Sequence, residues 1–232
     1  MKINAGIRYI ENGMTASLRA MHVDSELVGI ANENVTGFDK VGYQRKDPVI
    51  SSFTEFLGVH GLSTTLDDQV GRIALTDNPL DLAIATKGYF QTQSKDGMKL
   101  TRDGRFKIDK QGNLLTLDDS KVLANNGTAI KLHILPEKLK DIVVNSKGMV
   151  SVFNKDTNKL EKVATLGIVD ANGGLVISPE VKQGYNEYSN VSLQNEFMGM
   201  MPAIRGFDAN RQLFMIQSQN LTKAISQLGS AS

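Results

Sequence analysis

The closing stretch FMGMMPAIRGFDANRQLFMIQSQNLTKAISQL, from Phe197 to Leu228, carries the strongest periodic signal in the sequence. Apolar residues recur in it every seven positions, at Met200, Phe207, Phe214, Leu221 and Leu228, with further support from Ile204 and Ile225. Such a repeat places side chains on one face of an α-helix, and its length favours helices that wind on other helices. Pro202 lies inside the stretch and lacks a backbone N–H, so we expect it to kink the helix or to restart it.

The opening stretch of the chain has a related pattern. Apolar residues fall seven apart at Ile7, Met14, Met21 and Val28, and a second, weaker register runs through Ile3, Ile10, Ser17, Asp24 and Ala31. Two registers three or four positions apart form one stripe on a helix. The sequence therefore predicts a long amphipathic helix at each end of the chain.

These two stripes are the predicted self-assembly surface. An ordinary helix that packs on its own domain would also show an apolar stripe, and a weakly ordered tail is a second alternative for the closing stretch. The polar face after Gln194 is rich in amides and hydroxyls and poor in charges, which favours a helix enclosed by copies of itself. The predicted assembly residues are Ile3, Ile7, Ile10, Met14, Met21, Val28, Met200, Ile204, Phe207, Phe214, Leu221, Ile225 and Leu228.

Between the stripes, the helical period gives way to short β-type runs separated by Gly, Asn and Asp. Two of the intervening stretches, FKIDKQGNLLT and IVVNSKGMVSV, predict hairpins in which Gly112 and Gly148 adopt positive φ. The expected fold class is α+β, with N- and C-terminal helices that pair as a coiled-coil-like bundle around an inserted all-β central domain. The expected domains are residues 1–46 (a helix and a following loop), 47–190 (β-rich) and 191–232 (a helix), so that the helical domain is discontinuous.

Composition excludes several classes of function. The chain has 232 residues with 26 Lys and Arg against 25 Asp and Glu, and this balance lacks the positive excess of a nucleic-acid binder. It contains no cysteine, which excludes disulfides, thiolate metal sites and a cysteine nucleophile. We find no apolar run long enough for a cleaved signal peptide or a membrane span. We therefore expect no nucleic-acid partner and no membrane insertion.

The residues that usually carry chemistry form no recognisable site. His22, His60 and His133 are far apart in sequence, and none belongs to a metal-binding pattern. The common phosphate-binding loops and the hydrolase nucleophile motif are missing from the sequence. We accordingly expect no catalytic, cofactor-binding or metal-binding residues, no cofactor, and a protein that is not an enzyme. The alternative from another class is a wall-processing enzyme that uses Asp81, Asp103 or Asp109 as acids.

A succession of three motifs resembles the central block of bacterial flagellar rod and hook subunits. The motifs are TDNPLDLAI (Thr76 to Ile84), GYF (Gly88 to Phe90) and LTRDGRF (Leu100 to Phe106), in this order. The ends of the chain add Asn34, Thr36–Gly37–Phe38 and Ser189–Asn190–Val191 to the resemblance. Near the N-terminus Leu27–Val28–Gly29 interrupt the family's usual pattern. Within the family, the chain is most similar to basal-body rod proteins of the F/G type.

The resemblance implies a structural subunit of the flagellar basal-body rod, an axial drive shaft that transmits torque from motor to hook. Its short connecting segments favour a proximal rod protein, with a distal rod or short hook-type subunit as the alternative. The implied partners are the chain itself, other flagellar axial proteins and the flagellar type III export apparatus. The implied location is the periplasmic rod of the basal body, reached without a cleaved signal peptide. A flagellar export chaperone with coiled-coil ends is the remaining alternative.

Overall fold

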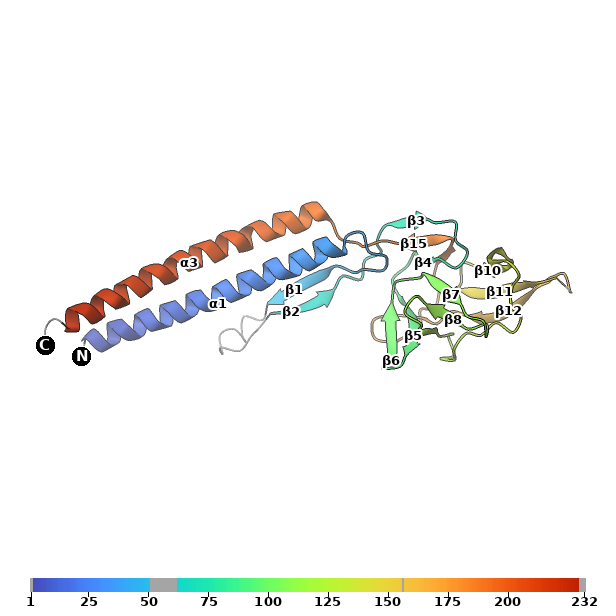
Figure 1. Ribbon diagram of the computed structural model, residues 1–232, viewed down its shortest axis with the longest axis horizontal. Coiled ribbons are helices and arrows are strands. Elements are labelled where there is room, and N and C mark those ends of the chain that lie inside the picture. Colours follow the sequence, from blue (N-terminus) through green and yellow to red (C-terminus); the bar gives the residue numbers. More distant parts are fainter. Residues whose placement is uncertain (1, 51–61, 156, 230–232) are drawn as a thin grey trace. The chain divides into compact units, whose positions relative to one another are not determined.

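The computed structural model describes residues 2–50, 62–155 and 157–229, and the side chains of the first helix from Gly13 onward (Figure 1). The side chains of Ile3, Ile7 and Ile10, and the whole of His60, lie outside this description. The fold is α+β, with a helix at the N-terminal end, a β-rich central region and a helix at the C-terminal end. This order of elements agrees with the sequence prediction.

The chain divides into two compact units. The helical unit comprises residues 1–36, 46–65 and 192–232, and the β unit comprises residues 37–45 and 66–191. The sequence assigned the central domain to residues 47–190, whereas contacts group the described residues 46–50 and 62–65 with the helices and residues 37–45 with the strands. A change in hydrophobic period marks where helices stop, but it does not indicate which unit a short connecting segment joins.

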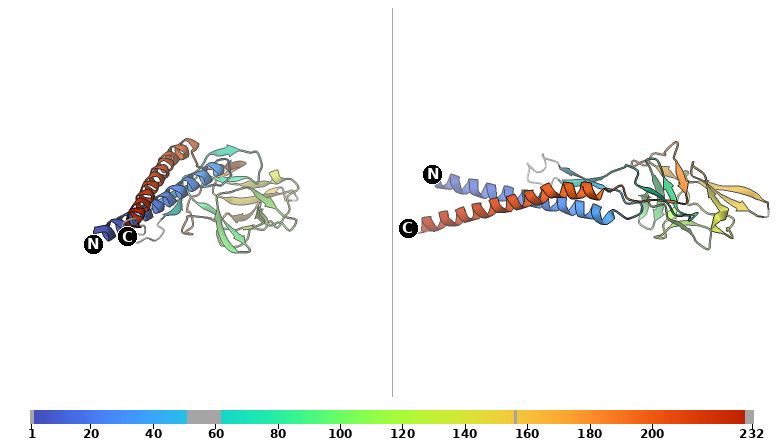
Figure 2. Two further views of the ribbon diagram at one scale, coloured as in Figure 1. Left: turned by 60° about the vertical axis from the view of Figure 1, so that its left-hand side comes forward. Right: turned by 90° about the horizontal axis from the view of Figure 1, so that it is seen from above.

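The helical unit contains α1 (Lys2–Gly37), α3 (Leu193–Gly229) and a two-stranded sheet of β1 (Lys46–Ile50) and β2 (Leu62–Leu66). The two helices run side by side, and α1 begins at the end of the pair where α3 ends (Figures 1 and 2). Helix α3 continues through Pro202, so the residue does not restart the helix. The carbonyl of Met198 consequently lacks the helical N–H that a residue other than proline would donate to it.

The β unit consists of short antiparallel strands, as the spacing of β-type runs predicts. They are β3 (Ile73–Leu75), β4 (Leu82–Ile84), β5 (Tyr89–Ser94), β6 (Gly97–Thr101), β7 (Phe106–Ile108), β8 (Leu114–Thr116), β9 (Lys121–Val122), β10 (Ile142–Val144), β11 (Met149–Asn154), β12 (Lys159–Thr165), β13 (Ile168–Val169), β14 (Val181–Gln183) and β15 (Tyr185–Glu187), with a 3-10 turn at Leu139–Asp141. The largest sheet has the order β13-β5-β9-β8-β7, with β6 also paired to β5. Strands β10-β11-β12 form a second sheet, and β14-β4 and β15-β3 form two pairs.

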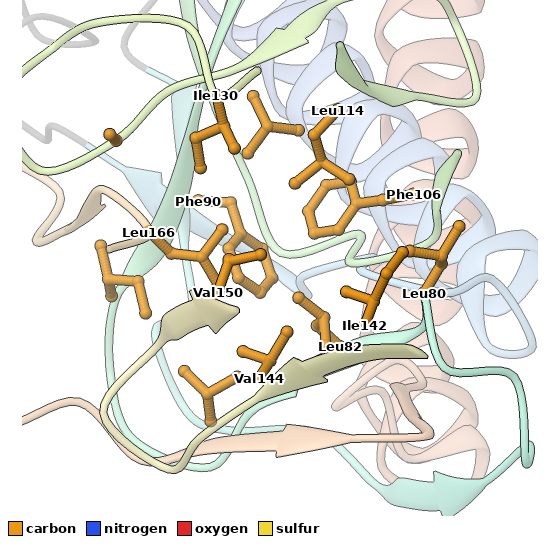
Figure 3. Close-up of a cluster of buried hydrophobic side chains, with 14 of the residues drawn as sticks. Leu80, Leu82, Phe90, Phe106, Leu114, Ile130, Ile142, Val144, Val150 and Leu166 are labelled. Atoms are coloured by element: carbon orange, nitrogen blue, oxygen red, sulfur yellow. The ribbon is translucent and has the colours of Figure 1, made fainter. Parts of the chain in front are cut away.

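One apolar core fills the β unit (Figure 3). At its centre the rings of Phe90 and Phe106 meet edge to face, with centroids 5.1 Å apart. The side chains of Leu82, Ile130 and Val150 surround them from three different parts of the chain. Every buried residue of this core lies between Leu80 and Val181, so the core draws on the β unit alone.

The two predicted hairpin turns are confirmed. Gly112 and Gly148 have φ values of 84° and 77°, in the region that favours glycine. Three residues before each glycine, Asp109 and Asn145 accept hydrogen bonds through Oδ1 from backbone N–H groups of their own turn. The turns are therefore built by the same local mechanism.

Candidate assembly surface

Helices α1 and α3 contact each other through polar and small residues. The Asn34 amide donates to the Glu196 carboxylate over 3.0 Å, and both side chains are buried. Farther along the pair, the Asn210 amide donates to Asp24 over 3.2 Å. A Cβ added to Gly206 would lie 2.8 Å from the carboxylate of Asp24, so the helices approach closely at this level.

The register of α1 that faces α3 is the one with the weaker apolar pattern. Ser17 and Ala31 are buried, and Asp24 between them makes the contact described above. On α3, Ala203 is buried and the side chain of Gln217 lies against Gly13. Small, amide and carboxylate side chains therefore make the closest contacts between the two helices.

The predicted assembly residues with described side chains are all at least partly accessible in the chain. Those that are half-buried are Met14, Met21, Val28, Met200, Phe214 and Leu221. Those that are exposed are Ile204, Phe207, Ile225 and Leu228, with exposed fractions of 36% to 59%. They belong to two helices of one unit, and none is fully enclosed within this chain.

A further set of exposed apolar side chains on α3 was not predicted as a site. It consists of Phe197, Met198, Met201, Leu213, Met215 and Ile216, with exposed fractions of 49% to 57%. Phe197 lies seven residues before Ile204 and supports the heptad register, whereas the other five residues fall outside it, so a search for heptads passes over them. A count of apolar residues around the whole circumference of the helix would have found them, because α3 exposes apolar side chains on more than one face.

Two of these residues, Phe197 and Met215, define one face of α3 together with the predicted assembly residue Ile204, and we call it the outer face. Phe197, Ile204 and Met215 lie seven and eleven residues apart, which is close to two and three helical turns. A second line along α3, separate from the outer face, carries exposed polar side chains seven residues apart, at Arg205, Gln212 and Gln219. The exposed ion pair between Arg211 and Asp208, 3.7 Å apart, adds little stability of its own.

The acids named in the enzyme alternative are occupied by structural contacts. Asp81 is buried and accepts hydrogen bonds from Asn78 and Asn186, while Asp103 pairs with Arg105 over 2.6 Å. The side-chain amide of Asn113 and backbone N–H groups hold the pKa of Asp109 below its ordinary value. A general acid needs a raised pKa, whereas the pKa of Asp109 is lowered, so its surroundings do not suit that role.

Metal-binding and membrane-spanning features are also missing from the part of the chain that the structure describes. Within it, no three His, Asp or Glu side chains gather in a way that could hold a metal ion. Neither described helix combines the length and the hydropathy that crossing a bilayer requires.

Comparison with known proteins identifies the family. Residues 83–152 match the model described as the flagellar hook protein FlgE/F/G D1 domain, and residues 182–228 match the model described as the flagellar basal body rod FlgEFG protein C-terminal domain. The flagellar basal-body rod protein FlgG of Bacillus subtilis (strain 168) is 28% identical, over 84% of this chain and 89% of that protein. The flagellar basal-body rod proteins FlgF of Mesorhizobium japonicum and Rhizobium meliloti are 26% and 29% identical, over 90% and 86% of this chain and 92% and 88% of those proteins. The chain thus belongs to the flagellar basal-body rod proteins of the F/G type, a family of structural proteins rather than enzymes.

Proposed function

We propose that this chain is a structural subunit of the flagellar basal-body rod and that it assembles through the outer face of α3. The observation that carries the proposal is the exposure of Phe197, Ile204 and Met215 on a helix whose seam with α1 is made of small and polar residues. A helix pair of this kind leaves its apolar surface for neighbours to cover. Copies of the same chain offer such a surface at every position of a polymer.

Covering this surface contributes favourably to the free energy of association. Full burial of a large apolar side chain contributes about 1.5–3 kcal/mol, so completing the burial of a half-exposed one contributes about 1 kcal/mol. Several exposed residues on α3 contribute in this way within each subunit. In a polymer, each subunit both covers a neighbour and is covered, so the gain recurs along the whole assembly.

In the assembled state, α1 and α3 pair in a coiled-coil-like manner. Support comes from the seven-residue registers in both helices and from the contacts of Asn34 and Asp24 with α3. The close approach at Gly206 fits tight packing of the two helices. We place the chain in the proximal part of the rod, with other flagellar axial proteins as its neighbours. It reaches the periplasmic rod through the flagellar type III export apparatus.

A single charge on the outer face tests the proposal. Ile204→Asp places a carboxylate where a neighbour would bury an isoleucine, whereas Gln212→Asp adds the same charge on the polar line of the same helix. The two variants are produced in cells that lack the natural copy, and motility, isolated basal bodies and secretion of each protein are compared. We expect secretion of both variants and rods only with Gln212→Asp.

Normal rods built from Ile204→Asp subunits would contradict the proposal, because the outer face could then not be an interface. The export-chaperone alternative predicts a different result. It requires one-to-one binding of another flagellar protein by the unmodified chain, without self-assembly.

A further inference from the structure

We propose that two asparagines, Asn34 and Asn190, act as clasps that hold together the chain segments connecting the helical unit and the β unit. The inference rests on the proposed rod function, because its consequence concerns how readily the terminal helices assemble. The chain passes from one unit to the other four times, between residues 36 and 37, 45 and 46, 65 and 66, and 191 and 192. Each asparagine contacts the segments at three of these crossings within its own unit.

Asn34 is the clasp of the helical unit. Its side chain is 1% exposed and lies two residues before the first crossing. Its Oδ1 accepts the backbone N–H of Lys46 over 2.9 Å, and its Nδ2 donates to the backbone carbonyl of the same residue over 2.9 Å. The same Nδ2 donates to Glu196 over 3.0 Å. One side chain therefore ties α1 to the first residue of β1 and to the first turn of α3.

Asn190 is the corresponding clasp of the β unit. Its Oδ1 accepts the backbone N–H of Arg45 over 2.7 Å. Its Nδ2 donates to the backbone carbonyls of Asp67 and Gln69, over 3.2 Å in each case. Arg45, Asp67 and Asn190 lie beside the second, third and fourth crossings. Only an amide side chain offers an acceptor and two donors in this arrangement, so neither Asp nor Ala can replace it.

Backbone hydrogen bonds extend the clasp of the β unit into a short antiparallel ladder. Val41 pairs with Tyr188, flanked by a bond from the Gly42 N–H to the Glu187 carbonyl (2.8 Å) and one from the Ser189 N–H to the Lys40 carbonyl (3.1 Å). This pattern makes Val41 and Tyr188 a non-hydrogen-bonded pair, whose side chains are close. The segments that lead out of α1 and into α3 are thereby fastened to each other within the β unit.

Holding these segments together lowers the entropic cost of pairing α1 with α3. Arg45 and Asn190 are 145 residues apart in sequence, and bringing such distant segments together has an entropic cost that grows with the length of the loop. Once the clasps are closed, the helices are held at a high effective concentration, of about millimolar order for a short link. The clasps therefore prepare the helix pair that a growing rod incorporates.

The test compares purified full-length variants. Asn190→Ala removes the clasp of the β unit, and Asn126→Ala serves as the matched control, because the hydrogen bonds that the Asn126 side chain accepts come from Thr128 in its own turn. A third protein combines Asn190→Ala with Val41→Cys and Tyr188→Cys. A disulfide at this pair suits the geometry of a non-hydrogen-bonded pair, and the chain has no other cysteine to interfere. The two cysteine substitutions without Asn190→Ala show the effect of the bridge alone.

We measure the protein concentration at which polymer first sediments. We expect Asn190→Ala to raise it about tenfold, the factor that corresponds to the loss of one or two hydrogen bonds, and Asn126→Ala to leave it unchanged. Oxidation of the triple variant should restore the value of the unmodified chain, and reduction should abolish the rescue. Assembly of Asn190→Ala at the concentration of the unmodified chain, or an oxidised bridge that brings no rescue, would overturn the inference.

Hydrogen exchange separates failure of the clasp from failure of the rod proposal. In monomers we expect the Gly42 and Ser189 amides to exchange at least about tenfold faster in Asn190→Ala than in the unmodified chain, with core strand β5 unaffected. If the unmodified chain forms no polymer, the rod proposal fails and this exchange alone decides the clasp. Unchanged exchange at Gly42 and Ser189 would then overturn it.

Discussion

The positively charged side chain of Arg102 is buried in the interior of the β unit. Its guanidinium pairs with Glu187 over 2.6 Å and donates to the backbone carbonyls of Ile84, Thr86 and Gly88. Glu187 also accepts the backbone N–H of Gly71. Because both charges are buried, each compensates the desolvation of the other, and the loss of one leaves the other without a partner.

Neutralising one member of this pair should therefore destabilise the β unit. We expect Glu187→Gln to lower the free energy of unfolding by about 3–5 kcal/mol, as for other buried pairs that lose one charge. Replacing both residues, with Arg102→Met and Glu187→Leu, should be less harmful than the single change. Urea unfolding followed by circular dichroism measures both effects. A loss below about 1 kcal/mol for Glu187→Gln would show that the pair is not a major source of stability.

Asp109 provides a prediction with a defined pH dependence. Hydrogen bonds from Asn113, Gln111 and Gly112 lower its pKa in the folded state. A carboxyl with a lowered folded pKa contributes stability above its unfolded pKa, near 4, and loses that contribution as the pH falls through the folded value. Asp109→Ala should therefore be less stable than the unmodified chain at neutral pH, and the difference should disappear in acid.

Asp109→Asn is the matched control, because Asn145 builds the equivalent turn with an amide oxygen. It should retain more stability than Asp109→Ala at neutral pH. Thermal unfolding across the pH range measures the comparison. A difference between Asp109→Ala and the unmodified chain that grew with acidity would have the wrong sign for this account.

The sequence predicted that the two terminal helices exist, but it did not predict which face of α1 contacts α3. The seven-residue repeats predicted α1 and α3, because a heptad sustained over many turns is typical of long helices that pack on other helices. The registers of α1 lie within one stripe, so the pattern alone could not select the one that faces α3. Close approach at Gly206 and the hydrogen bond from Asn210 to Asp24 select the register with small and polar residues.

Phe214 is the central member of the strongest predicted register. It is half-buried in the chain, so a neighbour is needed to cover it fully. We expect Phe214→Asp to abolish incorporation into rods, since it forfeits about 1.5–3 kcal/mol of apolar burial and adds a charge that must lose its water. The β unit should remain folded, and Ser218→Ala on the same helix should assemble normally. Isolated basal bodies provide the measurement, and rods containing Phe214→Asp subunits would refute this role for the residue.

At the scale of the whole molecule, local patterns predicted the β unit better than its long-range contacts. The turns at Gly112 and Gly148 follow from three or four consecutive residues. The pair of Arg102 and Glu187 joins residues 85 positions apart, and the Asn190 clasp joins residues up to 145 apart. Such contacts depend on the folded path of the chain, which neither spacing nor composition encodes.

The division into units predicts that the β unit folds independently. All buried residues of its core lie between Leu80 and Val181, so a fragment of residues 66–191 contains the complete core. We expect this fragment to be a monomer with β-type circular dichroism and a cooperative unfolding transition. The missing residues 37–45 should lower its stability without preventing folding, since they contribute the ladder at Val41 and no core side chain. An unfolded or mainly helical fragment would contradict the division.

In the function that we propose, the exposed apolar outer face of α3 makes this chain a self-assembling subunit. Sedimentation of the purified full-length chain over a range of concentrations, with electron microscopy of the sedimented material, tests it most directly. We expect a concentration above which the chain forms a regular polymer, while Ile204→Asp stays monomeric at the same concentration. A chain that remains monomeric throughout, or an Ile204→Asp variant that polymerises equally well, would contradict it.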